Sequence, residues 1–341
     1  MLEAVMIEPG CIEFREVPKP EIGENQVLVE VKACGICGSD LHVWHGTHPF
    51  TTYPVIQGHE FSGIVDHVGP GVQSVQPGQR VTVEPSLVCG RCYACRHGRY
   101  NICDDLKVMG FQAPGCHQEF FAVPAEKVVW IPRTLSFEAG AMVEPVAVGV
   151  HAVRRSDLEP GMKVVVLGAG PIGILTAQVA KALGAFKTLI VDIVDFRLEV
   201  ARKVGVDHVV RDGAGDVARG IRKIFGPDGA DLIFECVGAE ATVETAVQVA
   251  RKGTRVMVVG VVEGRSRVSM GLVQDRELEL VGTLMYMKRD FEQAIRLMSE
   301  GAVRTAELIT ARFPFRDLPR AYEEADRNRE GNVKVMVRFE A

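Results

Sequence analysis

The sequence has no stretch of about 20 consecutive apolar residues, the length that a helix needs to cross a bilayer. Its first residues, MLEAVMIEPGCIEF, also lack the uninterrupted apolar run of a signal peptide, because charge and proline come too early. We therefore expect a cytoplasmic protein that has no membrane partner.

An excess of positive charge is missing as well. The chain has 39 Lys and Arg residues against 44 Asp and Glu residues, a formal net charge of -5. Proteins that bind nucleic acids need a concentrated basic face, so this balance argues against a nucleic-acid partner and favours a small-molecule substrate.

Tandem repeats and low-complexity segments are absent too, and what remains is the pattern of an α/β protein. The 341 residues, 47% of them hydrophobic, exceed what one core usually serves, which predicts two domains. Residues 1 to about 150 contain short alternating apolar runs, typical of half-buried strands joined by turns. From Lys163, apolar strands alternate with amphipathic helices, which predicts a doubly wound parallel sheet. Residues after 289 could extend this sheet or return to the first domain.

A glycine-rich turn follows the first apolar strand of the second half. Gly168, Gly170 and Gly173 have the spacing G-x-G-x-x-G and enclose Pro171 and Ile172 at the start of a predicted helix. Such glycines allow a tight turn and close approach to a pyrophosphate, while the helix N-terminus supplies amide donors. The turn therefore predicts a dinucleotide site; the alternative is a turn without a ligand.

An acidic residue ends the next predicted strand. Asp192 lies nineteen residues after Gly173, where a carboxylate can accept hydrogen bonds from ribose hydroxyls and would repel a 2'-phosphate. This favours NAD over NADP. Arg197 could stack on the adenine or could be a solvated helix residue.

Four of the nine cysteines fall within fifteen residues, in the stretch CGRCYACRHGRYNIC. Cys89, Cys92, Cys95 and Cys103 have the spacing C-x2-C-x2-C-x7-C, which suits one tetrahedral zinc ion; an Fe–S cluster is the alternative. Four thiolates leave no position for a substrate, so this metal would be structural. A zinc module that binds nucleic acid is a further alternative, but the flanking residues lack a basic helix.

A second set of candidate ligands is scattered along the first half. It comprises Cys37, His59, Glu60 and Glu144. Thiolate, imidazole and carboxylate groups suit zinc, and fewer than four firm ligands would leave an open position for chemistry. Cys11, Cys34, Cys116 and Cys236 remain, and we expect them to act as small hydrophobic residues.

Taken together, the motifs resemble one family. GICGSDLH, GHEFSG, the four-cysteine stretch, VEPVAVGVHA and GAGPIG occur in the order found in zinc-dependent medium-chain alcohol and polyol dehydrogenases. The resemblance covers essentially the whole chain. It implies a GroES-like catalytic domain of residues 1–150 completed by 290–341, a Rossmann domain of residues 151–289, and an active site in the cleft between them. It also implies NAD, one catalytic and one structural zinc ion, and a homo-oligomer, either a dimer or a tetramer.

The resemblance also implies roles for individual residues. Cys37, His59 and Glu60 match the ligands of the catalytic zinc, and Glu144 matches a carboxylate that binds it directly or through water. Ser39 and His42 match the family's proton relay. The implied reaction is hydride transfer from a secondary alcohol to the nicotinamide, with zinc lowering the pKa of the alcohol.

The stretch FEAGAMVEPVAVGVHAVRR is similar to the sorbitol and polyol branch, with one departure. Met285 and Tyr286 stand where sorbitol dehydrogenases have an Arg-Tyr pair, and a thioether cannot donate hydrogen bonds to a polyhydroxyl chain. We therefore expect a polyol-like secondary alcohol as substrate. A threonine 3-dehydrogenase-like or general alcohol dehydrogenase activity, or a non-catalytic coenzyme-binding role, are the alternatives. Trp44 and Tyr286 could line the substrate pocket or could be packing residues.

Overall fold

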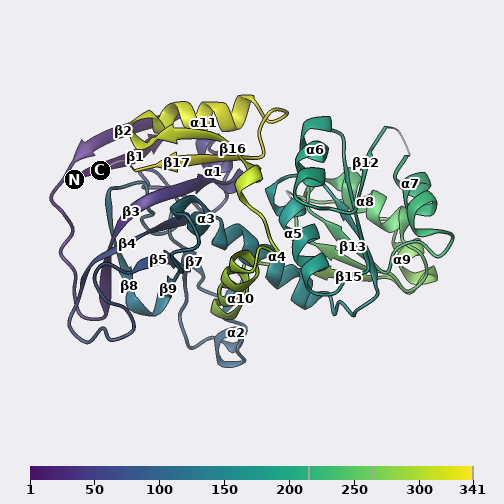
Figure 1. The fold of residues 1–341 in the computed structure, drawn as a ribbon, viewed down its shortest axis with the longest axis horizontal. Coiled ribbons are helices and arrows are strands. Elements are labelled where there is room, and N and C mark those ends of the chain that lie inside the picture. Colours follow the sequence, from purple (N-terminus) through teal and green to yellow (C-terminus); the bar gives the residue numbers. More distant parts are fainter. Residues whose placement is uncertain (214–215, 263, 340–341) are drawn as a thin grey trace. The chain divides into compact units, whose positions relative to one another are not determined.

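The computed structural model describes residues 1–213, 216–262 and 264–339. The chain divides into two compact units (Figure 1). Unit 1 contains residues 1–144, 287–295 and 309–341, and unit 2 contains residues 145–286 and 296–308. No helix among the described residues is long and apolar enough to cross a membrane.

Unit 1 is built mainly from strands. Its elements are β1 (Leu2–Glu8), β2 (Cys11–Glu16), β3 (Gln26–Ile36), α1 (Gly38–Trp44), β4 (Glu60–Val68), β5 (Arg80–Val83), β6 (Ser86–Leu87), α2 (Tyr93–Arg96), β7 (Lys107–Val108), β8 (Phe120–Pro124), β9 (Val128–Trp130), α3 (Phe137–Ala141), β16 (Ile309–Pro314), α11 (Leu318–Arg327) and β17 (Lys334–Arg338). Helix α10 (Lys288–Ser299) begins in this unit, and α4 (Val143–Arg155) begins at its border.

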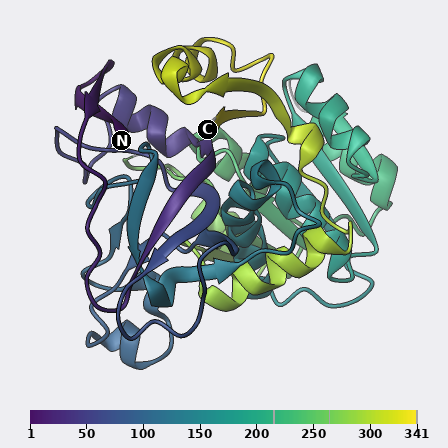
Figure 2. The same cartoon turned by 60° about the vertical axis from the view of Figure 1, so that its left-hand side comes forward.

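A seven-stranded sheet forms the body of unit 1. Its main path runs β16-β17-β3-β4-β5-β9, and β8 also pairs with β3. Strand β17 pairs antiparallel with the end of β3, so the C-terminal segment lies directly beside the N-terminal part, as the yellow and purple strands show in Figures 1 and 2. Apolar side chains from β3, β4, β17 and α11 share one hydrophobic core.

Unit 2 alternates strands and helices. Its elements are β10 (Lys163–Leu167), α5 (Pro171–Ala182), β11 (Lys187–Asp192), α6 (Asp195–Lys203), β12 (His208–Arg211), α7 (Asp216–Phe225), β13 (Leu232–Glu235), α8 (Glu240–Val249), β14 (Arg255–Val258), α9 (Met270–Asp275) and β15 (Glu279–Gly282).

The six strands of unit 2 form one parallel sheet in the order β12-β11-β10-β13-β14-β15. Val164, Val165 and Val166 of β10 are completely buried, because a central strand of such a sheet is covered on both faces. The strand order reverses between β10 and β13, and this reversal in a parallel sheet places the connecting helices on both faces. The predicted doubly wound parallel sheet is confirmed.

Candidate functional site

The first candidate ligand, Cys37, lies between the end of β3 and the start of α1. Its backbone N–H donates a 2.9 Å hydrogen bond to Oδ2 of Asp40, which lies in the first turn of α1 and is completely buried. The strand end and the helix start therefore fix the direction of the Cys37 side chain. Asp40 was not among the predicted site residues, although an acidic residue in the first turn of a helix is a recognised signal for the start of that helix.

His59 directly precedes β4, and Glu60 is the first residue of this strand. The antiparallel register of β3 and β4 sets Glu60 opposite Gly35, two residues before Cys37. One ligand atom from each of Cys37, His59 and Glu60 lies within 4.8 Å of the other two. Cys37 thus meets His59 and Glu60 because two strands pair, although it is distant from them in the sequence.

Gly35 is required by the position of the Glu60 side chain. A Cβ atom at residue 35 would lie 2.2 Å from Oε2 of Glu60, well inside van der Waals contact. The missing side chain leaves the space in which the Glu60 carboxylate lies.

Asp40 also faces the imidazole ring of His59. Nδ1 of His59 lies 3.4 Å from Oδ1 of Asp40, longer than a normal hydrogen bond but within ion-pair distance. Burial lowers the pKa of His59. The charge of Asp40 and the contact with Cys37 raise this pKa by more than burial lowers it, so the pKa stands well above its usual value. Because Nδ1 faces Asp40, Nε2 is the nitrogen left to bind a metal ion beside Cys37.

Glu60 has a charged partner that no sequence motif predicted. Nζ of Lys334 lies 2.8 and 2.6 Å from the two carboxylate oxygens of Glu60 and donates to the carbonyl of Ile36 at 3.2 Å. Both charged side chains are buried. A signal was present, because Lys334 lies within the apolar strand VKVMVRF, where a charged residue at a buried position needs a partner.

Glu144 lies in the first turn of α4 and is buried, but it is not part of the group formed by Cys37, His59 and Glu60. Its charge does act on Lys334. Burial lowers the pKa of Lys334, and the charges of Glu60, Cys37 and Glu144 raise it above its usual value. Lys334 therefore remains an ammonium ion among these acidic groups.

Ser39 and His42 are three positions apart on α1, so they lie on the same face of this helix. Both side chains are half-buried. Nδ1 of His42 lies 3.5 Å from Oγ1 of Thr47. A hydroxyl and an imidazole group thus lie one helical turn apart, directly after Cys37.

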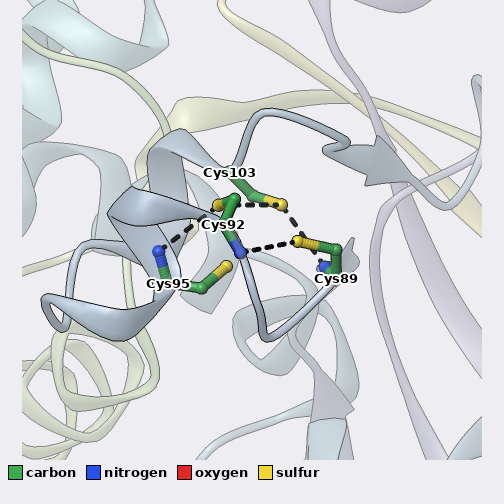
Figure 3. A group of neighbouring side chains, drawn as sticks. All are labelled: Cys89, Cys92, Cys95 and Cys103. Atoms are coloured by element: carbon green, nitrogen blue, oxygen red, sulfur yellow. Dashed lines mark hydrogen bonds between the residues drawn. The ribbon is translucent and has the colours of Figure 1, made fainter.

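The four cysteines of the second metal candidate converge around the short helix α2. One sulfur atom from each of Cys89, Cys92, Cys95 and Cys103 lies within 4.8 Å of the others (Figure 3). Backbone N–H groups of Cys92 and Cys95 point at the sulfur atoms of Cys89 and Cys92, at 3.3 and 3.4 Å.

The thiols of this group differ in their acidity. Hydrogen bonds from the backbones of Asp104 and Cys95 lower the pKa of Cys92 to about 6. Desolvation and hydrogen bonds with Cys92 and Cys103 raise the pKa of Cys95 to about 12. Four crowded thiols of this kind can all be ionised only if a cation offsets their charge, which suits a metal ion.

One residue ties this loop to the rest of unit 1. The hydroxyl of Tyr100 accepts a 2.6 Å hydrogen bond from the backbone N–H of Lys288 and donates a 3.3 Å bond to the buried carboxylate of Glu84. Burial raises the pKa of Tyr100, and the charge of Glu84 raises it further. The tyrosine therefore stays protonated and keeps its role as donor.

The glycine-rich turn lies in unit 2 between β10 and α5. Gly168 has φ +98°, and a Cβ atom at Gly173 would lie 1.8 Å from the carbonyl oxygen of Gly168. Gly170 precedes the first turn of α5, which begins with Pro171 and Ile172. The turn follows the central strand β10 at the point where the strand order reverses, which is where dinucleotides bind such sheets.

Asp192 ends β11 and holds this turn in place. Its carboxylate accepts hydrogen bonds from the backbone N–H groups of Ala169, at 2.6 Å, and Val194, at 2.9 Å. The sequence pattern predicted only a coenzyme contact for Asp192, and the structure adds this contact with the turn. Arg197 is half-buried on α6.

Of the two aromatic candidates for the substrate pocket, one packs on another aromatic ring and the other is buried. Trp44 is half-buried and stacks on Tyr322 with ring centroids 5.2 Å apart. Tyr286 is completely buried. These observations favour the packing alternative for both residues. Met285 is half-buried and has φ +54°, an unusual value for a residue other than glycine.

The remaining cysteines are not in disulfide bonds. Cys34 and Cys116 are buried with their sulfur atoms 3.2 Å apart, whereas Cys11 and Cys236 are half-buried. Burial raises the pKa of Cys34 and of Cys116, so both remain protonated.

Comparison with known proteins identifies relatives along the whole chain. Residues 23–133 match the model of the alcohol dehydrogenase GroES-like domain, and residues 171–300 match that of the zinc-binding dehydrogenases. The chain is 33% identical over 342 residues to a sorbitol dehydrogenase of Bacillus subtilis, covering 99% of this chain and 97% of the relative. It is 34% identical over 347 residues to a D-xylulose reductase of Saccharomyces cerevisiae, and the alignment covers 98% of this chain and 97% of the relative.

A similar solved structure is that of a zinc-binding dehydrogenase from Sinorhizobium meliloti bound to NADP. It superimposes with a TM-score of 0.92 at 34% identity, covering 99% of this chain and 98% of the other.

Proposed function

Because the chain belongs to the zinc-dependent medium-chain dehydrogenases, in their polyol-dehydrogenase-like branch, we propose that it oxidises a secondary alcohol of a polyol-like or sugar-derived substrate. The product is a ketone, and NAD accepts the hydride. Residues 1–150 with 290–341 act as the catalytic domain, and residues 151–289 as the coenzyme domain.

The observation that carries the proposal is the meeting of Cys37, His59 and Glu60, whose ligand atoms lie within 4.8 Å of one another. One thiolate, one imidazole and one carboxylate group suit zinc, and three ligands leave a fourth position for an alcohol oxygen. Glu144 would serve as a further carboxylate, directly or through water. When bound, zinc would supply the Lewis acidity that lowers the pKa of the alcohol.

The protein's own groups handle the proton. The hydroxyl of Ser39 accepts it from the alcohol, and the imidazole of His42, one helical turn away, passes it to solvent. His42 suits this last step because its side chain is only half-buried and so retains access to water.

The turn at Gly168, Gly170 and Gly173 would bind the pyrophosphate of the coenzyme, and Pro171 and Ile172 begin the helix whose free N–H groups would face it. Asp192 would accept hydrogen bonds from the adenosine ribose, and Arg197 would hold the adenine. The bound nicotinamide would supply the hydride acceptor.

The substrate is a polyol-like alcohol, which the relatives named for sorbitol and D-xylulose support. Met285, in place of the arginine of sorbitol dehydrogenases, argues against sorbitol itself. The nine free cysteines fit a reducing cytoplasm, and a dimer or tetramer fits the family.

The test is NADH formation on a panel of polyols, sugar acids, cyclitols and threonine. We expect turnover on a polyol-like member and its loss in Cys37→Ser, together with loss of one zinc ion per chain. Cys11→Ser is the control, because Cys11 lies on a strand outside both candidate metal sites. This variant should keep its turnover and its zinc content. Full turnover in Cys37→Ser would contradict the site, and turnover on threonine alone would favour the threonine 3-dehydrogenase alternative.

A further inference from the structure

A chain of buried hydrogen bonds leads from Asp40 away from the candidate metal ligands. Nε2 of Gln57 donates to Oδ1 of Asp40 at 3.5 Å, and the hydroxyl of Tyr322 donates to Oε1 of Gln57 at 3.0 Å. Each of these three side chains is at most 2% exposed. Tyr322 lies on α11, more than 260 residues after Gln57 in the sequence.

The chemistry of the three groups fixes the direction of this chain. An ionised carboxylate only accepts hydrogen bonds, so Gln57 must turn its NH₂ group toward Asp40. The carbonyl oxygen of Gln57 then faces Tyr322, which must donate. Without the Tyr322 hydroxyl, this buried carbonyl oxygen would lose its partner, and the amide would no longer be anchored on the side away from Asp40.

Tyr322 is itself held rigidly. Its ring stacks on Trp44 at 5.2 Å between centroids and meets the edge of His117 at 5.9 Å. Trp44 belongs to α1, the helix that also carries Asp40. The aromatic contact therefore fixes the phenol relative to the same helix whose carboxylate it supports.

We propose that Gln57 and Tyr322 are positioning residues for the metal site. They hold the Asp40 carboxylate in the orientation that faces Nδ1 of His59, and Asp40 in turn orients the imidazole for binding through Nε2. This rests on the proposed function, in which Cys37, His59 and Glu60 bind zinc. Partners behind a metal-binding histidine commonly change metal affinity about 10- to 100-fold when they are removed.

The experiment compares Tyr322→Phe with Tyr53→Phe. The control also removes one phenol hydroxyl that packs against the core of unit 1, but the hydroxyl of Tyr53 donates to the backbone carbonyl of Val43 on α1 and not to Gln57. Zinc transfer to a chromogenic chelator is followed for each holoenzyme, and Cys37→Ser identifies the kinetic phase that belongs to the Cys37 site.

We expect Tyr322→Phe to release zinc from this site about tenfold faster than wild type, and Tyr53→Phe to release it at the wild-type rate. With Co²⁺ in place of zinc, the visible absorption bands should shift in Tyr322→Phe and not in the control. Gln57→Met breaks the same chain from its middle, so it should reproduce both effects and serves if Tyr322→Phe folds poorly.

Equal release rates and identical Co²⁺ spectra for Tyr322→Phe, Gln57→Met and the control would overturn the positioning role. Failure of the proposed function gives a different result, because Cys37→Ser would then keep every zinc ion that the wild type binds.

Discussion

The ammonium group of Lys334 lies 2.6 Å from a carboxylate oxygen of Glu60, and both side chains are buried. Lys334 belongs to β17 and Glu60 to β4, the two strands that flank β3. The contact passes over Gly35 of β3, which has no side chain to block it. A cation from the C-terminal segment thus holds a candidate metal ligand from the N-terminal part.

Removing the lysine should leave the Glu60 charge buried without compensation. Lys334→Met should lower the free energy of unfolding of zinc-depleted protein by about 3 to 5 kcal/mol, measured by urea denaturation. Lys32→Met is the control, because Lys32 pairs with Glu30 in a partly exposed contact. This substitution should lower the free energy of unfolding by at most about 1 kcal/mol. Adding Glu60→Gln to Lys334→Met should recover part of the loss; strictly additive costs would show that the pair is not coupled.

The space above Gly35 gives a second prediction. A Cβ atom in Gly35→Ala would force the Glu60 carboxylate out of its position, so zinc affinity at the Cys37 site should fall about tenfold. Gly38→Ala is a matched control two residues beyond β3, since a Cβ atom there meets nothing within 4 Å. Zinc competition with a chelator measures both variants. Equal affinities would mean that the carboxylate is free to move.

The four-cysteine loop should affect stability before activity. Cys95→Ser should remove one zinc ion per chain and lower the Tm by about 5 to 10 °C, the change expected for a loss of a few kcal/mol. Elemental analysis and thermal unfolding measure these effects, with Cys11→Ser as the control. Turnover per folded molecule that fell together with the zinc content would instead indicate a catalytic metal at this loop.

Asp192 accepts hydrogen bonds from the turn and is also proposed to bind the coenzyme, and Asp192→Ser removes the carboxylate that serves both roles. Asp192→Ser should lower kcat/KM for NAD by about tenfold and improve the ratio of NADP to NAD use, because the charge that repels a 2'-phosphate is gone. It should also cost about 1 to 3 kcal/mol of stability, since the N–H groups of Ala169 and Val194 lose their acceptor. Asp195→Asn, at an exposed pair with Arg211, is the control. A wild-type preference for NADP would refute the coenzyme role.

The carboxylate of Glu138 connects α3 to β16 and β17 and should make stability depend on pH. Burial raises its pKa, but hydrogen bonds from Arg338 and Arg312 lower it by more, so its pKa is below the usual value of 4.5. A carboxyl group with a lowered pKa stabilises the fold above its unfolded pKa, and this contribution disappears as the pH falls through the folded value.

Because both arginines are partly exposed, Glu138→Gln should lower the free energy of unfolding by only about 1 kcal/mol at pH 7. The difference in this free energy between variant and wild type should shrink below about pH 4.5. Urea unfolding of both proteins at pH 7 and at lower pH measures this difference. A difference that stayed constant across this range would show that the Glu138 charge is not involved.

Most of the fold followed from patterns along the chain. The alternation of apolar strands and amphipathic helices after Lys163 predicted the parallel sheet that unit 2 contains, because each such element must bury an apolar face. For the segment after residue 289, the residues alone left two alternatives open, either an extension of the parallel sheet or a return to the first domain. Its strand VKVMVRF is apolar enough for either sheet, and only pairing decided that β17 lies against β3.

The sequence by itself determined what depends on close spacing. Within each of three groups, the residues must lie close together in almost any fold. The groups are the four cysteines within fifteen residues, the three glycines at a strand end, and the serine and histidine three positions apart. The tertiary structure alone decided which distant residues complete these groups. Lys334 reaches Glu60, and Tyr322 reaches Asp40 through Gln57, because strand register and helix packing join segments more than 250 residues apart, and no local pattern specifies such contacts.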